Sequence, residues 1–172
     1  MSFQVLNASG YARRGELTTK TCTVQTPVFM PVGTYGTVKG LTPEHLHDIG
    51  FEIILGNAFH LHQRPGLETI KKFNGLHDFM GWNKSILTDS GGFQIWSLND
   101  LRKITEEGVE FKSPLDGSKI FMSPEDSIDT QLTLNSDIIM AFDECTDYPS
   151  SYEDAEQSMH LTHRWTERSL NY

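Results

Sequence analysis

The sequence predicts an α/β fold in which parallel strands alternate with crossover helices. Short apolar segments repeatedly precede helix-start signals along the 172 residues, and this alternation is typical of parallel sheets. Two such segments, residues 86–88 and 136–142, run directly into Asp89 and Asp143. A hydrophobic content of 37% with 22% charged residues is typical of a globular domain with its own core.

The first third of the chain predicts β-structure followed by a well-capped helix. Residues 3–6 and 21–26 are strand candidates, residues 11–17 indicate a hairpin, and residues 28–30 form an extended apolar segment that would start a larger sheet. Thr42 and Pro43 predict a helix start, and that helix would end near Gly50. A buried strand is expected at 51–57, a helix from 64 through 71, and a loop at 75–84.

The second half continues the same alternation. Asp116-Gly117 between apolar segments predicts a hairpin of residues 109–113 and 119–122. Ser123 followed by proline and acidic residues predicts a helix to about residue 135. Residues 136–145 are expected to form a second buried strand that finishes on a carboxylate, and the capping-box pattern of residues 150–153 would start a helix reaching about residue 170.

The turn after residue 88 predicts a binding site for a planar heterocycle. Asp89 stands where the strand would end, and Ser90, Gly91 and Gly92 follow with little side-chain bulk. Two glycines allow positive φ and let a flat ligand approach bare backbone, whose N–H groups can converge on one acceptor. Phe93 adds a ring that can stack on a base. The same composition also occurs in ordinary turns, but at the carboxyl ends of barrel strands Asp89 and Asp143 would face one pocket.

Composition narrows the classes of protein. A net charge of −9 argues against a surface built throughout for nucleic acid. No apolar run approaches the roughly 18 residues of a membrane span, and the N-terminus lacks signal-peptide features. Cys22 and Cys145 are far apart, which disfavours a disulfide framework or a cysteine zinc site within the chain. We therefore expect a cytoplasmic protein.

His60 and His62 follow the strand predicted at 51–57. Two histidines in this spacing after a barrel strand can bind a metal, so a metal-dependent hydrolase is one alternative. We favour loop histidines without a ligand role, because no third ligand cluster is evident in the sequence.

With both carboxylate-bearing stretches in view, the sequence resembles the bacterial tRNA-guanine transglycosylases of the queuosine pathway. The matching segments span nearly the whole chain in the family's order, at residues 27–34, 56–61, 64–66, 88–94 and 140–145. The resemblance implies a (β/α)8 TIM barrel, of which residues 1–172 would form the N-terminal part of a single domain. That part would include a β-rich N-terminal segment and a hairpin insertion.

The resemblance also implies a reaction and roles for residues. Members exchange guanine at the wobble position of tRNAs with a GUN anticodon for preQ1, through a covalent double displacement. By match, Asp89 is the general acid/base, Ser90, Gly91, Gly92 and Phe93 form the base pocket, and Asp143 accepts hydrogen bonds from the base. A carboxylate suits the two donors of guanine, whereas adenine would leave it unpaired. The base must leave its stack to reach such a pocket.

The sequence departs from the family in length. Full-length members are considerably longer, and their later half carries the covalent Asp nucleophile, a basic tRNA surface and a structural zinc held by Cys and His. We therefore expect a fragment, a truncated product or one part of a split protein that is inactive alone, with its zinc ligands outside this chain. Lys39 and Phe79 resemble positions near the family's homodimer interface. A non-catalytic partner subunit remains the alternative, although keeping both carboxylates disfavours it.

Overall fold

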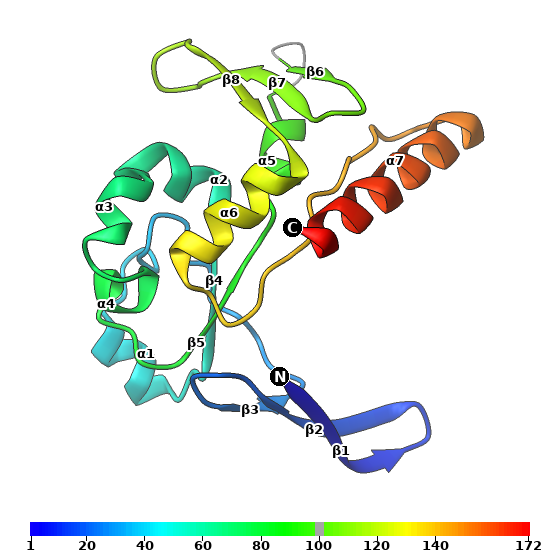
Figure 1. The fold of residues 1–172 in the computed structure, drawn as a ribbon. Coiled ribbons are helices and arrows are strands. Elements are labelled where there is room, and N and C mark those ends of the chain that lie inside the picture. Colours follow the sequence, from blue (N-terminus) through cyan, green and yellow to red (C-terminus); the bar gives the residue numbers. More distant parts are fainter. Residues whose placement is uncertain (99–101) are drawn as a thin grey trace.

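The computed structural model describes residues 1–98 and 102–172, and these residues form a mixed α/β structure. Their strands group into a sheet β1-β2-β3, a parallel pair β4-β5 and a sheet β6-β7-β8. Figure 1 shows the first sheet beside the N-terminus, the parallel pair in the middle and the third sheet at the opposite end. The mixed α/β class predicted from the sequence is confirmed.

The N-terminal sheet is antiparallel. It consists of β1 (Ser2–Ser9), β2 (Ala12–Thr18) and β3 (Thr23–Thr26), which confirms the β-rich start. All residues of β1 are exposed, and its pairing with β2 shifts register between Val5 and Asn7. Val24 of β3 is fully buried, and the Gln25 N–H of the same strand donates to Glu52 Oε2 at 2.8 Å, which joins this sheet to the body of the chain.

The central strands are parallel. β4 (Ile53–Gly56) pairs with β5 (Ser85–Thr88), and single parallel bridges, Val32 to Leu55 and Leu87 to Ile138, extend the arrangement on both sides. The strand predicted for residues 136–145 is wrong in length, because only Ile138 makes a ladder contact. The physical reason lies at Met140, whose N–H and C=O both bond to the side chain of Gln131 instead of a strand.

The helices between the parallel strands are short. They are α1 (Pro43–Ile49), α2 (Ala58–Leu61), the π-helical turn η1 (His62–Gly66), α3 (Leu67–Lys71) and α4 (Leu76–Met80). Thr42 caps α1 in a capping box, and Gly50 ends it in the left-handed conformation. The loop predicted for residues 75–84 is wrong at α4, which forms because Leu76 is fully buried in the core with Phe79 packed against it.

The second half has the expected hairpin and two longer helices. Its elements are α5 (Gly92–Trp96), β6 (Arg102–Ile104), β7 (Val109–Lys112), β8 (Lys119–Met122), α6 (Pro124–Leu134) and α7 (Tyr152–Asn171). Ser123 caps α6 through a capping box with Asp126, and Ser151 caps α7. α6 contacts α2, α3 and α7, so it crosses the middle of the molecule in Figure 1.

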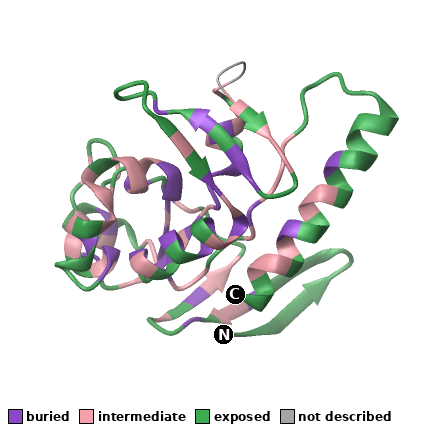
Figure 2. Ribbon diagram, turned by 45° about the horizontal axis from the view of Figure 1, so that its top comes forward, coloured by how far each residue is buried: buried purple, intermediate pink, exposed green. Residues whose placement is uncertain are grey.

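Two hydrophobic clusters form the core. One packs the parallel strands against α1, α3 and α4, and the other joins the β6-β7-β8 sheet to α5 and α7 through side chains such as Phe111, Phe142 and Trp165. Figure 2 colours the buried residues purple and shows them on the central elements, whereas β1 is exposed along its length. Among the described residues, no helix has the length and hydropathy needed to cross a membrane.

Candidate functional site

Asp89 lies at the carboxyl edge of the parallel pair. Its N–H donates to the carbonyl of Gly56, the last residue of β4, at 3.1 Å. Its Oδ1 accepts the Ala58 N–H at 2.9 Å, and its Oδ2 accepts the amides of Gln94, at 2.9 Å, and Asn57. Donors from two adjacent strand ends therefore hold this half-buried carboxylate in one orientation.

Asn57 is a site residue that the sequence interpretation did not assign a role. It follows β4 as Asp89 follows β5, and it is buried. Its position at the carboxyl end of a parallel strand is the signal that identifies it, because such ends gather at one edge of a sheet.

Asp143 is linked to the same edge through Ser90. The Ser90 hydroxyl donates to Asp143 Oδ1 at 2.9 Å, and the Cys145 thiol lies 3.5 Å from Oδ2. Because Ser90 directly follows Asp89, the two carboxylate-bearing segments lie side by side. Burial, with the nearby negative charge of Asp143, raises the pKa of the Cys145 thiol to about 12, so the thiol stays protonated and can act as a donor.

Glycine is needed at the two positions of the turn for different structural reasons. Gly91 has a φ of 90°, in the left-handed region that favours glycine. Gly92 is required by crowding, since a Cβ there would collide with the carboxylate and carbonyl oxygens of Asp143. The bare backbone at Gly92 thus lies against Asp143.

The cavity next to Asp143 is small. It has a volume of about 10 Å³, about that of one water, and it is lined by Gly92, Ile95, Trp96, Arg102, Ile104, Val109, Phe142, Asp143, Glu144, Cys145 and Trp165. Asp89 is not in its wall, and a purine needs more room. Binding a base beside Asp143 would therefore require neighbouring side chains to move.

Phe93 provides the aromatic face of the site. Its side chain is 61% exposed and stacks on Trp96 with a centroid distance of 5.2 Å. The Arg102 guanidinium lies 5.9 Å from the centre of the Trp96 ring, and the Trp96 indole donates to Asp147 at 2.9 Å. The exposed ring of Phe93 is free to receive a planar group.

His60 and His62 have different surroundings. The ring of His60 lies 5.2 Å from that of Tyr35, and its buried Nδ1 has no hydrogen-bond partner among the described residues. His62 Nδ1 is 3.2 Å from the hydroxyl of Thr130. Burial lowers the pKa of both rings, with the Asp89 charge opposing this effect at His60. Residues 1–98 and 102–172 contain no cluster of three or more potential metal ligands.

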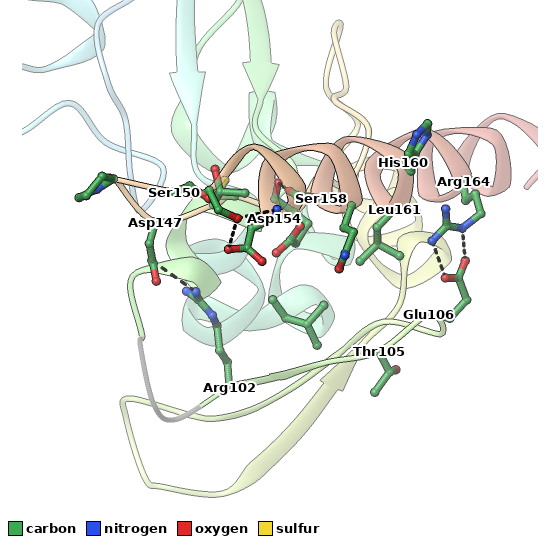
Figure 3. A pocket seen from close by; sticks show the side chains of 17 residues that line it. Arg102, Thr105, Glu106, Asp147, Ser150, Asp154, Ser158, His160, Leu161 and Arg164 are labelled. Carbon is green, nitrogen blue, oxygen red and sulfur yellow. Dashed lines mark hydrogen bonds and ion pairs between the residues drawn. The ribbon is translucent and has the colours of Figure 1, made fainter.

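A larger groove lies beside the segment that follows Asp143, although neither Asp89 nor Asp143 is in its wall. It has a volume of about 880 Å³ and lies between β6, the segment after Asp143 and α7. Figure 3 shows Arg102 directed at Asp147, and Arg164 paired with Glu106. The first pair is separated by 3.8 Å and the second by 2.7 Å. The Arg164–Glu106 pair joins α7 to the connection between β6 and β7, and the Arg102–Asp147 pair joins β6 to the segment before α7.

The fold and site define an α/β protein with a polar site at the carboxyl edge of its parallel strands. The chain belongs to the family described as queuine tRNA-ribosyltransferase, whose model matches residues 8–172.

Similar proteins with that name occur in several bacteria. The chain is 62% identical over 168 residues to the queuine tRNA-ribosyltransferase of Acinetobacter baumannii strain AYE, and 61% identical over 169 residues to that of Dechloromonas aromatica strain RCB. These matches cover 98% of this chain but 45% and 46% of the relatives. The chain therefore spans less than half the length of the relatives it matches.

Proposed function

We propose that this chain provides the base-recognition part of a tRNA-guanine transglycosylase. The observation that carries the proposal is the link between Asp89 and Asp143 through Ser90, at the carboxyl edge of β4 and β5. Membership of the family and the names of the relatives support the reaction class. The proposed reaction exchanges guanine in tRNA with a GUN anticodon for preQ1.

Asp143 is proposed to recognise the base. Its two carboxylate oxygens already face neutral donors, the Ser90 hydroxyl and the Cys145 thiol. The N1–H and the exocyclic amine of guanine would present two donors to the same oxygens. Adenine would leave one acceptor unpaired, which costs about 1–3 kcal/mol. Phe93, whose ring is exposed, is proposed to stack on the bound base.

Asp89 is proposed to move the proton during exchange. Asn57, Ala58 and Gln94 fix its carboxylate, and such positioning is what general acid–base catalysis needs. Exchange through double displacement also needs a nucleophile at the ribose carbon. Following the resemblance, we assign that role to a carboxylate outside residues 1–172, so the isolated chain would bind a base without exchanging it.

The remaining features of the family are proposed on the same basis. The two parallel strands and the flanking bridges at Val32 and Ile138 support placement in a (β/α)8 barrel completed by other residues. The structural zinc would be held outside the described residues, which contain no ligand cluster for it. We further propose a homodimer whose interface includes Lys39 and Phe79. The complete enzyme would act on tRNA in the cytoplasm.

Guanine binding tests the proposal. Calorimetry with the purified 172-residue chain should detect guanine and show weaker binding by Asp143→Asn, by about tenfold or more. Asp129→Asn, a change at an exposed residue of α6, serves as the matched control. The same preparations are then incubated with radiolabelled guanine and tRNA. Absence of guanine binding by the unaltered chain contradicts the proposed recognition, and robust label incorporation contradicts the proposed need for an outside nucleophile.

Metal analysis separates this proposal from a hydrolase that uses His60 and His62. A stoichiometric divalent ion that is lost in His60→Ala and His62→Ala would favour the hydrolase. We expect both variants to have the same metal content as the unaltered chain.

A further inference from the structure

Helix α6 turns two polar side chains into the protein interior. Ser127 and Gln131 are one helical turn apart, so they share a face of the helix, and they are 1% and 0% exposed. Buried polar groups of this kind are retained where they have specific partners. Their partners belong to the two segments that carry Asp89 and Asp143.

Gln131 makes the larger set of contacts. Its Oε1 accepts the Met140 N–H at 2.8 Å and the Thr88 hydroxyl at 3.1 Å, and its Nε2 donates to the Met140 carbonyl at 2.8 Å. The amide thus pairs with both backbone groups of Met140, as a neighbouring strand would. Thr88 immediately precedes Asp89, and Met140 lies shortly before Asp143.

Ser127 holds the other side of Asp89. Its hydroxyl donates to the Ser90 carbonyl at 2.7 Å, while the Ser90 hydroxyl bonds to Asp143. The residues on both sides of Asp89 are therefore bound to α6. The two α6 side chains also connect to each other, because Gln131 Nε2 lies 3.4 Å from the Ser127 hydroxyl.

We infer that Ser127 and Gln131 are positioning residues that set the separation of Asp89 and Asp143, and through it the affinity and selectivity for guanine. The inference rests on the proposed function. Hydrogen bonds are directional, so they fix the strand ends more narrowly than apolar packing would. A recognition site tolerates displacements of only about 0.5 Å before its contacts weaken.

The test measures guanine and adenine binding by calorimetry with the full 172-residue chain. Ser127→Ala removes the bond to Ser90, and Gln131→Met removes the amide while keeping a similar volume. Ser127→Thr retains the hydroxyl, and Thr133→Ala changes a neighbouring partly exposed residue of α6. Circular dichroism establishes that each variant is folded before its binding is compared.

We expect Ser127→Ala and Gln131→Met to lose guanine affinity by about tenfold or more, together with much of the preference for guanine over adenine. Ser127→Thr and Thr133→Ala should stay within about threefold of the unaltered chain. A purely structural role would lower stability but leave the selectivity of the folded variants unchanged, and that result overturns the inference.

The remaining outcomes also test the inference and separate it from the proposed function. If Gln131→Met does not fold, the comparison of Ser127→Ala with Ser127→Thr alone tests the inference. If the unaltered chain binds guanine and folded Ser127→Ala binds it equally well, the inference falls while the proposed function stands. If the unaltered chain does not bind guanine, the proposed function fails and the inference fails with it.

Discussion

Replacing Asp137 with asparagine should destabilise the protein in a pH-dependent way. The Asp137 side chain is fully buried. Its Oδ1 accepts the Thr21 N–H at 3.0 Å, and its Oδ2 accepts the Ile86 N–H at 2.9 Å and lies 3.1 Å from His77 Nε2. One carboxylate therefore joins the end of the N-terminal sheet to β5 and α4.

The size of the effect follows from the pKa of Asp137. Burial raises this pKa, but the hydrogen bonds from His77, Thr21 and Ile86 outweigh burial and lower it from 3.8 to about 2. Since one pKa unit corresponds to about 1.4 kcal/mol, the ionised carboxylate contributes about 2–3 kcal/mol at neutral pH. A lowered folded-state pKa means that this stability is complete well above pH 3.8 and is lost as the pH falls toward 2.

Urea unfolding at several pH values checks this reasoning. Asp137→Asn should lower the free energy of unfolding by about 2–3 kcal/mol at pH 7, with about half of that difference remaining at pH 3. Asp48→Asn, at an exposed residue of α1, should change it by less than about 0.5 kcal/mol. The reasoning is refuted if the difference between Asp137→Asn and the unaltered chain is constant between pH 7 and pH 3.

Three further predictions concern the site and the second hydrophobic cluster. Gly92→Ala should displace Asp143 and weaken guanine binding, measured by calorimetry, by about tenfold or more. Gly33→Ala is the control, because a Cβ at Gly33 meets only ordinary contacts. Equal binding of guanine by the two variants would contradict the crowding argument. Cys145 should react with iodoacetamide at pH 8 at least about a hundredfold more slowly in the folded chain than in urea, because its pKa is raised to about 12; similar rates would contradict that shift. Trp165→Ala removes a fully buried indole and should cost about 3–5 kcal/mol in thermal or urea unfolding, and a loss below about 1 kcal/mol would contradict its place in the core.

The sequence correctly predicted the helix starts and the hairpin that depend only on residues close together in the chain. Thr42 and Ser123 cap their helices as expected, because a cap needs only residues within one turn. Asp116-Gly117 lies in the connection of the β7–β8 hairpin, where Gly117 has a φ of 75°. Each of these predictions depended on neighbours along the chain.

The wrong predictions involve contacts between distant residues. α4 follows Gly75, without a polar cap, and it is stabilised by burying Leu76, which no local pattern indicates. The segment after residue 136 has strand composition, but Gln131 occupies the backbone groups of Met140. In the same way, the sequence indicated Asp89 and Asp143 as site residues, but the contacts of Ser127 with the Asp89 turn depend on how α6 packs.

The stack of Phe93 on Trp96 gives the protein a built-in fluorescent reporter. Of the three tryptophans, Trp82 and Trp165 are buried, whereas Trp96 is partly exposed beside the turn that follows Asp89. A purine that inserts against Phe93 would change the environment of this indole, whereas Trp82 lies in the other hydrophobic cluster. Titration of the unlabelled chain can therefore follow occupancy of the site optically, with Trp96→Phe as the variant that isolates the contribution of Trp96.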